Sequence, residues 1–303
     1  MSTNKPSPTD AVRWLIAPAT DEMPRAQAVG ATALRILVGL MWLYNVSWKR
    51  APDFGEEAGN GLFKFTSYAV SDPVFPPFSW VVENIVLPNF ALFGWGVLFA
   101  ETALAVLLLT GAWVRVAAAV GLAQSVAIAM SVAFAPHEWP WSYWLMIGAH
   151  GLLLVSTAGR VLAVDAVRAG APARMLGQVW GMLSVIVGLI SVLWSLDDPM
   201  AERGPGLRST DLSISLGEYN LVGGLVLMAV GAMLLVSVRG GPRRMAQLAA
   251  ALAVLAGLSL HAQLGFSDPV LGGSTTSAAF FFAAALVAAW VGAGSRQAQD
   301  VPT

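Results

Sequence analysis

Four polar residues stand inside otherwise apolar stretches of the chain, and their side chains could bind a ligand and move protons. They are Arg35, Glu101, Gln124 and His150. The histidine titrates near neutrality, with an ordinary pKa of about 6.5, and the glutamine can donate a hydrogen bond without titrating. The arginine and the glutamate could pair and handle protons. Ionisable residues within membrane-spanning segments are costly and are functional candidates by default.

The composition places these residues in a membrane protein. The 303 residues are 56% hydrophobic and 12% charged, whereas soluble domains carry about 25% charged residues. The net charge of −1 gives no indication of a nucleic-acid partner. The chain contains no cysteine and three histidines, which excludes thiolate-held clusters and disfavours a dedicated metal site. We therefore expect the lipid bilayer as a partner, and no metal or covalent cofactor.

Eight stretches approach the length of about 20 apolar residues that a membrane-spanning helix needs. They cover residues 27–47, 88–111, 114–134, 141–158, 176–196, 218–238, 245–264 and 276–293. The predicted fold is an all-α integral membrane protein with about eight transmembrane helices in two four-helix halves. Residues 1–26 and 297–303 are predicted tails, 27–170 the first membrane bundle, and 171–296 the second half. Residues 9–17 could lie on the membrane surface or belong to a disordered tail.

The basic residues predict the orientation. Of the 17 Lys and Arg residues, eleven fall in the tails and loops of one side, five fall on the other side, and Arg35 is within a span. Cytoplasmic loops are enriched in Lys and Arg, so we expect both termini in the cytoplasm and the chain in the inner (plasma) membrane. No apolar signal-peptide region is visible in the first 26 residues.

Depth within the spans predicts a shared polar layer. Counting from the cytoplasmic end of each span, the four polar residues lie between about 10 and 15 Å deep. We therefore expect Arg35 to pair with Glu101, and Gln124 and His150 to face the same site. The competing interpretation is structural, since a buried ion pair can simply fix helix register and a glutamine can tie two helices together.

The predicted outer side carries a second candidate cluster. The loop at residues 48–87 contains Pro73, Pro76 and Pro77, and Pro88 follows it. Because prolines interrupt helices, we expect one or two short amphipathic helices over the outer mouth rather than one long helix. A head group or an anion could bind there, although the aromatic residues also fit an interfacial belt. The candidates for this outer-mouth site are Lys49, Glu138, Trp139 and Tyr143.

An ordered set of short motifs resembles the DoxX/DoxD family of bacterial membrane proteins. The set spans about residues 27–170 and comprises Arg35-x3-Gly39, Trp48-Lys49, Pro88-Asn89, Glu101, Leu107–Gly111-x3-Arg115 and Ala158–Arg160-x4-Asp165. The resemblance implies a four-helix membrane bundle related to the membrane subunit of thiosulfate:quinone oxidoreductase. Trp48 departs from the glycine that is common in the family before the lysine, and the second four-helix half is absent from the short members.

The resemblance and the polar layer together lead to a functional hypothesis. We expect a membrane oxidoreductase subunit that binds quinone as a substrate and passes it electrons from thiosulfate or another external donor. Arg35 and Glu101 would be the catalytic, proton-handling pair, and Gln124 and His150 would contact the quinone oxygens. A partner subunit or donor protein is expected, and a homo-oligomer is possible. The alternatives are a non-catalytic scaffold for a partner enzyme and a small-solute transporter.

Overall fold

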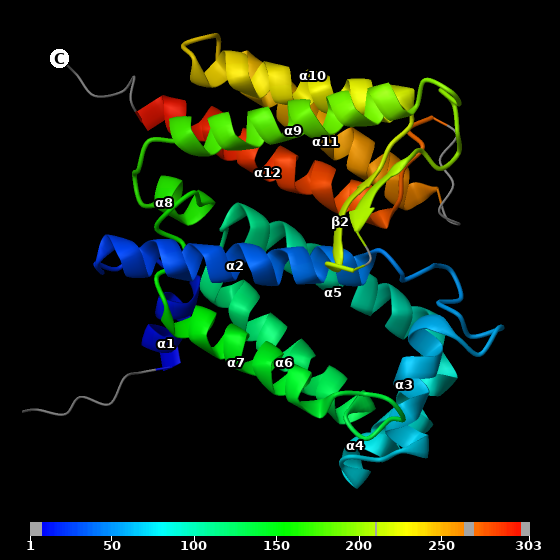
Figure 1. Ribbon diagram of the computed structural model, residues 1–303. Coiled ribbons are helices and arrows are strands. Elements are labelled where there is room, and N and C mark those ends of the chain that lie inside the picture. The colour runs from blue at the N-terminus through cyan, green and yellow to red at the C-terminus, as the bar shows by residue number, and fades with distance from the viewer. Residues whose placement is uncertain (1–7, 210, 264–269, 298–303) are drawn as a thin grey trace, which may run out of the picture.

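The computed structural model describes residues 8–209, 211–263 and 270–297, and most of them are helical (Figure 1). Residues 298–303 of the predicted 297–303 tail, the first seven residues and the last residue of the predicted 245–264 span lie outside these ranges. The helices and strands are α1 (Pro8–Ile16), α2 (Arg25–Val46), α3 (Gly61–Ser71), α4 (Pro76–Val81), η1 (Val82–Val86), η2 (Leu87–Asn89), α5 (Phe90–Thr110), α6 (Val114–Val132), α7 (Pro140–Val155), α8 (Val164–Arg168), α9 (Arg174–Trp194), β1 (Gly206–Ser209), β2 (Ile214–Glu218), α10 (Leu221–Val238), α11 (Arg244–Ala262) and α12 (Thr275–Gln297).

Seven helical segments in the described part of the chain are long and apolar enough to cross a membrane. They are Arg25–Val46, Pro76–Thr110, Val114–Val132, Arg174–Trp194, Leu221–Val238, Arg244–Ala262 and Thr275–Ala293. The all-α membrane architecture is therefore confirmed at this level. The remaining predicted span, residues 141–158, corresponds to α7, which has only 16 residues. An α-helix of that length extends about 24 Å, which is short of a hydrocarbon core of about 30 Å.

The loop before α5 contains two short helices, α3 and α4, as its prolines predicted. Helical backbone runs from Pro76 to Thr110, through the π-turn η1 and the 3₁₀-turn η2. Pro76 begins α4, where a missing N–H costs nothing, and Pro88 lies within η2, directly after the π-turn. Such turns absorb the hydrogen bond that proline cannot make. At Asn89 the backbone leaves helical geometry, with φ −123° and ψ 35°, and this separates the direction of α4 from that of α5 (Figure 1).

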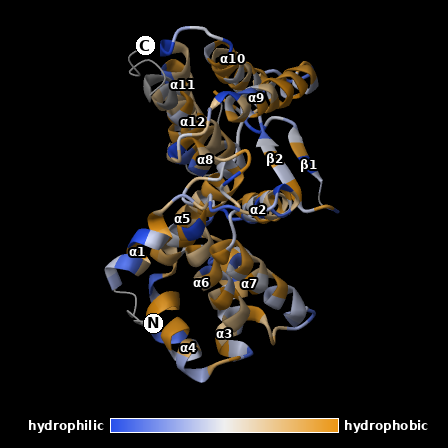
Figure 2. Ribbon diagram, turned by 90° about the vertical axis from the view of Figure 1, so that its left-hand side faces the viewer, coloured by the Kyte–Doolittle hydropathy of each residue, from blue (hydrophilic) through white to orange (hydrophobic). Residues whose placement is uncertain are grey.

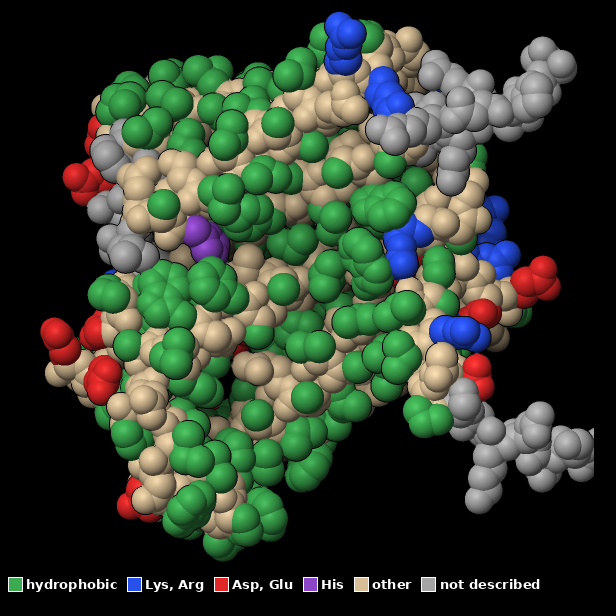
Figure 3. Space-filling view, turned by 180° about the vertical axis from the view of Figure 1, so that it is seen from behind, with side chains coloured by type: hydrophobic (Ala, Val, Ile, Leu, Met, Phe, Trp, Pro, Cys, Tyr) green, Lys and Arg blue, Asp and Glu red, His purple; other side chains and the backbone are tan. Residues whose placement is uncertain are grey.

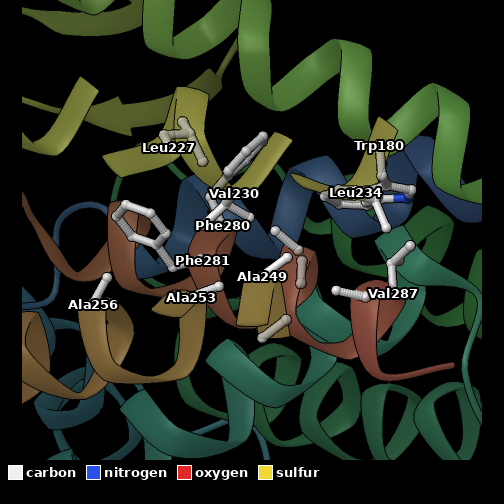
Figure 4. Packing of buried hydrophobic residues seen from close by; sticks show 14 of the residues in the cluster. Trp180, Leu227, Val230, Leu234, Ala249, Ala253, Ala256, Phe280, Phe281 and Val287 are labelled. Atoms are coloured by element: carbon white, nitrogen blue, oxygen red, sulfur yellow. The ribbon is translucent and has the colours of Figure 1, made fainter. Parts of the chain in front are cut away.

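The spanning helices form two groups that share one central helix. Helices α2, α5, α6 and α7 pack together, and so do α9, α10 and α11, while α12 contacts members of both groups. Figure 1 shows α12 between α9 and α10 on one side and α2 and α5 on the other. Its core contacts are made by Phe280, Phe281 and Val287, which meet residues of α9, α10 and α11 (Figure 4). Aromatic stacking joins the groups as well, with His261 of α11 lying against Phe99 of α5.

The outward faces of both groups are apolar, as a lipid environment requires. Large hydrophobic side chains such as Leu37, Leu92 and Leu145 are more than 60% exposed. Figure 2 shows hydrophobic residues along the helices and hydrophilic residues mainly at their ends. Since there is no water in the bilayer core to solvate backbone groups, helices with internal hydrogen bonds are the structures that can present such faces to it.

A short β-hairpin in the loop before α10 was not predicted from the sequence. Strands β1 and β2 are antiparallel, and β2 packs against α2 and α12. The hydroxyl of Ser277 in α12 accepts a hydrogen bond from the N–H of Glu218 (2.9 Å) and donates one to its carbonyl oxygen (2.6 Å). The hairpin thereby binds the end of the second group to α2 of the first.

Helix α1 is fixed to the end of the molecule that is predicted to be cytoplasmic. Arg115 donates a hydrogen bond to the carbonyl of Trp14 (3.3 Å), and its guanidinium lies over the Trp14 ring. Arg168 donates to the carbonyl of Ile16 (3.1 Å). Of the two interpretations of residues 9–17, a disordered tail does not fit these contacts. Helices α1 and α8 lie at the opposite end of the molecule from α3, α4 and the hairpin (Figure 1).

The orientation predicted from the basic residues can be tested with single cysteines in this cysteine-free chain. Glu57 and Ala171 are exposed, on the loop before α3 and after α8 respectively. An impermeant thiol reagent should label Glu57→Cys in intact cells and should label Ala171→Cys only after the membrane is opened. Labelling in the reverse order would mean that the chain is inserted the other way round.

Candidate functional site

A cavity of about 630 Å³ lies among α2, α3, the α4–η1 segment, α5, α6 and α7. Its wall is mainly apolar, and Figure 3 shows the hollow on the face of the molecule seen from behind, framed by hydrophobic side chains. The lining residues are Tyr44, Asn45, Trp48, Lys49, Leu62, Phe65, Thr66, Phe78, Val82, Val86, Phe93, Val97, Glu101, Gln124, Ala127, Ile128, Ser131, Val132, Glu138, Tyr143 and Met146. The two clusters predicted from the sequence as separate layers therefore meet in part at one cavity.

An ion pair between Lys49 and Glu101 forms the charged part of the cavity wall. The Lys49 Nζ lies 2.6 Å from the Glu101 Oε2, and the two side chains are 1% and 2% exposed. The same ammonium donates a hydrogen bond to the Asn45 carbonyl (3.0 Å) and lies 3.8 Å from the centre of the Trp48 ring. Two charges removed from water need such compensation, because an unpaired buried charge costs several kcal/mol, roughly 3–5 in measured cases.

The predicted pairing of Arg35 with Glu101 is wrong. Side chains in a helix tilt toward its N-terminus, and α2 and α5 run in opposite directions, since Gly111 lies beside Arg35 whereas Glu101 lies beside Lys49. The two side chains consequently diverge. Glu101 extends toward the end of the molecule where α2 finishes, and Lys49, just after that end, takes the place expected for the arginine.

Arg35 instead lies in a buried polar cluster at the opposite end of the membrane bundle. Its Nη2 donates to the carbonyl of Leu162 (2.9 Å) and to that of Val161 (3.4 Å). Nearby, Asp165 accepts hydrogen bonds from the N–H groups of Trp113 (2.9 Å) and Val114 (3.0 Å). These N–H groups at the start of α6 would otherwise lack partners, so Asp165 acts as a cap supplied from another part of the chain.

Further contacts make this cluster a structural joint. Asp165 also pairs with Arg168, at 2.6 Å between Nη1 and Oδ1, and its own N–H donates to the carbonyl of Gly111 (2.9 Å). Gly111 has φ +67°, and a Cβ at that position would overlap the Arg35 guanidinium. Arg35 therefore does not reach the cavity, and its contacts tie α2 to the segment after α7.

Gln124, Glu138 and Tyr143 lie on the wall of the same cavity, although the sequence placed Gln124 in the polar layer and the other two in the outer-mouth cluster. Gln124 comes from the middle of α6, and Tyr143 comes from the first turn of α7. The Tyr143 hydroxyl donates a hydrogen bond to the Glu138 carboxylate. Trp139 is not on the wall: it is 64% exposed and packs against Trp141, with ring centres 5.7 Å apart. The outer-mouth cluster thus divides into three cavity residues and one surface aromatic.

His150 is buried but does not line the cavity. The indole N–H of Trp42 donates to its Nε2 (2.9 Å), so this nitrogen is the unprotonated one. The Nδ1 is then the donor, and it faces the Met146 carbonyl at 2.8 Å. The ring packs so closely on Gly121 of α6 that a Cβ there would clash with it. Both nitrogens are occupied by protein groups, which places His150 among the residues that join α2, α6 and α7.

Several wall residues were not singled out from the sequence. Leu62, Phe65 and Thr66 of α3 line the cavity at positions i, i+3 and i+4, the spacing of one helix face. That spacing is visible in the sequence, but it does not show which span the face meets. Among the described residues, no group of three His, Cys, Asp or Glu side chains lies close enough together to hold a metal ion.

The balance of charge in the cavity restricts its ligand. The ionisable groups on the wall with formal charge are Lys49, Glu101 and Glu138. The lysine is fully compensated by Glu101, and Glu138 adds a negative charge that is hydrogen-bonded to Tyr143. An anion would therefore meet no uncompensated cation among the described lining residues. A neutral molecule with hydrogen-bonding groups at one end and an apolar body fits the wall better.

The ion pair predicts coupling in a double-mutant cycle. Lys49→Met and Glu101→Gln should each destabilise the protein by about 3–5 kcal/mol. The first variant leaves the buried carboxylate of Glu101 without its cation, and the second leaves the buried ammonium of Lys49 without its anion. The double variant should lose clearly less than the sum, as read from thermal unfolding in detergent. The matched cycle of Arg35→Met with Glu101→Gln should be additive within about 0.5 kcal/mol. Coupling in the second cycle and additivity in the first would restore the pairing that the structure replaces.

The joint around Arg35 predicts an unusual sensitivity at one glycine. Gly111→Ala should destabilise the protein by about 2–4 kcal/mol. Alanine is strained in the left-handed backbone conformation of this residue, and its methyl group would displace the hydrogen-bonded guanidinium of Arg35. Gly148→Ala in α7 is the control, since a Cβ there meets nothing within 4 Å. It should be neutral or slightly stabilising. Equal thermal stability of the two variants would contradict the close approach of Arg35 to Gly111.

No protein-family model, curated protein or solved structure matches the chain. The resemblance to the DoxX/DoxD family stays a prediction that is carried by the motif residues alone. Those residues divide between two places, since Arg35, Arg115 and Asp165 contribute to the joint and its surroundings, whereas Lys49 and Glu101 face the cavity.

Proposed function

We propose that the chain is a membrane oxidoreductase subunit that binds quinone in the cavity and reduces it with electrons from an external donor. The observation that carries the proposal is the buried Lys49–Glu101 pair in the wall of an otherwise apolar cavity. A cavity of about 630 Å³ falls within the range of about 300–1,000 Å³ that is usual for small-molecule sites. The apolar wall suits the ring substituents and tail of a quinone.

Reduction of a quinone needs hydrogen-bond donors and protons as well as electrons. Quinone takes up two electrons and two protons, and each carbonyl oxygen becomes a hydroxyl. The Gln124 amide can donate to one oxygen without titrating, and the Lys49 ammonium can donate to an oxygen near the ion pair. Glu101 is the group on the wall that can accept a proton from the protein and pass it on. In this assignment Glu101 and Lys49 replace the pair of Arg35 and Glu101, and His150 acts through packing.

The carboxylate of Glu138 and the hydroxyl of Tyr143 offer a second proton route, which leads toward the predicted outer side. Glu138 belongs to the loop between α6 and α7 and is partly exposed, and Tyr143 bonds to it from the cavity wall. Protons from the aqueous phase can reach Glu138 and then a ligand oxygen through the tyrosine hydroxyl. The site would therefore exchange protons with the side of the membrane where this loop lies.

The electron donor is proposed to act outside the cavity. Thiosulfate, the donor that the family resemblance implies, is a dianion, and the compensated charge of the wall does not favour it. A donor protein or partner subunit that contacts the loops near Glu138 and Trp139 is consistent with the exposure of Trp139 and Trp141, which are 64% and 54% exposed.

The proposal predicts that quinone affinity depends on Gln124 and not on an equivalent glutamine elsewhere. Gln124→Leu should weaken the binding of a short-tailed quinone to the purified protein about fivefold, the loss expected for one hydrogen bond of about 1 kcal/mol. Gln178→Leu in α9 is the matched control outside the cavity and should leave affinity unchanged. Binding can be measured by titration of intrinsic fluorescence or by calorimetry.

His150→Phe tests whether His150 supports the fold without contacting the quinone. It should lower thermal stability, because it removes the acceptor of the Trp42 indole, and it should leave quinone affinity near the wild-type value in the folded fraction. Wild-type protein that binds no quinone would overturn the proposal, and so would an unchanged affinity of Gln124→Leu.

A further inference from the structure

The α4–η1 segment, residues 76–86, has large apolar side chains toward the cavity and also on its outer face, where they lie beside the exposed residues Glu83 and Asn84. Phe78, Val82 and Val86 line the cavity. On the other face, Trp80 and Ile85 are 60% and 52% exposed. An outer face that combines large apolar side chains with a carboxylate and an amide is typical of a helix that lies in the boundary between lipid and water.

The position of the segment identifies lipid as its cover. It leads through η2 directly into α5, where Leu92 is 77% exposed, so the segment adjoins the exposed apolar face of a spanning helix. The helical path from Pro76 to Thr110 has 35 residues, about 52 Å if straight, which exceeds a hydrocarbon core of about 30 Å. The change of direction at Asn89 resolves this excess, since α4 runs across the ends of the spans instead of continuing α5 (Figure 1).

The cavity lies directly behind this segment, and the elements on either side of the hollow are apolar. Val81 and Ile85 on the α4–η1 segment are 38% and 52% exposed, and Val126 and Phe134 on or next to α6 are 37% and 64% exposed. The hollow in Figure 3 is framed by such hydrophobic side chains. A charged ligand crossing this rim would lose its hydration without a partner.

We propose that the α4–η1 segment is embedded in the outer lipid layer and forms a membrane-facing wall, beside which the cavity opens to the bilayer between this segment and α6. The ligand class that follows is a neutral amphiphile dissolved in the membrane, which reaches the Lys49–Glu101 pair sideways. This inference rests on the proposed function for the identity of the ligand as a quinone, but the placement of the segment stands on the geometry alone.

Site-directed nitroxide labelling of the full chain in liposomes tests the proposal, because the chain has no cysteine of its own. Labels would be attached at Ile85→Cys on the outer face, at Ala127→Cys on the cavity wall, and at two references. Glu57→Cys is the aqueous reference and Leu189→Cys, on the exposed face of α9, is the lipid reference. Each label is exposed to oxygen, which concentrates in lipid, and to a water-soluble nickel chelate.

The labels at positions 85 and 127 should collide with oxygen more than with the nickel chelate, as at position 189, whereas position 57 should show the opposite ratio. Nickel-dominated collisions at position 85 would place the segment in water and overturn the proposal. Oxygen-dominated collisions at position 85 together with nickel-dominated collisions at position 127 would also overturn the proposal, because the cavity would then open to the aqueous phase. Failure of the protein to bind quinone would leave these ratios unchanged, so the two proposals fail separately.

Discussion

The requirement that a charge within a lipid-embedded bundle be matched by another organises the structure. Glu101 lies near the middle of α5, and Lys49 satisfies it from the first residues after α2. After Lys49 the chain leads through a loop into α3, which packs against α6 and, through the rings of Phe63 and Phe90, against the start of α5. The cavity lies among these helices. The compensated carboxylate therefore lies in the wall of the cavity and not in a closed helix contact.

The other polar cluster has the opposite character, since it leaves no space for a ligand. Arg35, Gly111 and Asp165 fit so closely that a methyl group on Gly111 would not be accommodated. Asp165 is fully buried and is held by the backbone N–H groups of α6 and by Arg168. Polar residues that lie at a similar calculated depth therefore have different surroundings: Arg35 and His150 hold helices together, whereas Glu101 and Gln124 line the cavity. The number of protein partners distinguishes them.

Much of the helical architecture could be predicted from the sequence, because length and apolar composition determine which segments cross a membrane. The residues around the cavity were predicted less well, for identifiable reasons. The depth count treats each side chain as lying level with its Cα, and the long side chains of Arg35 and Glu101 extend in opposite directions from antiparallel helices. Gln124 was placed on the site wall because its short side chain stays close to the calculated level. His150 satisfied the same count, but its partner Trp42 is hidden among many aromatic residues. The hairpin depends on Ser277, 59 residues away from Glu218, which no local pattern could indicate.

The central position of α12 has a consequence for the biosynthesis of the protein. It is the most buried of the seven membrane-compatible helices in the described residues, with 72% of its apolar window inside the protein against at most 44% for the others. It is also the last of them to leave the ribosome, after α2, α5 and α9 have been made. Until it inserts, the faces of these helices that it will cover are open to lipid or to the insertion machinery. The packing between the two groups is therefore completed only after α12 has been made, because α12 contacts α2 and α5 of the first group and α9, α10 and α11 of the second.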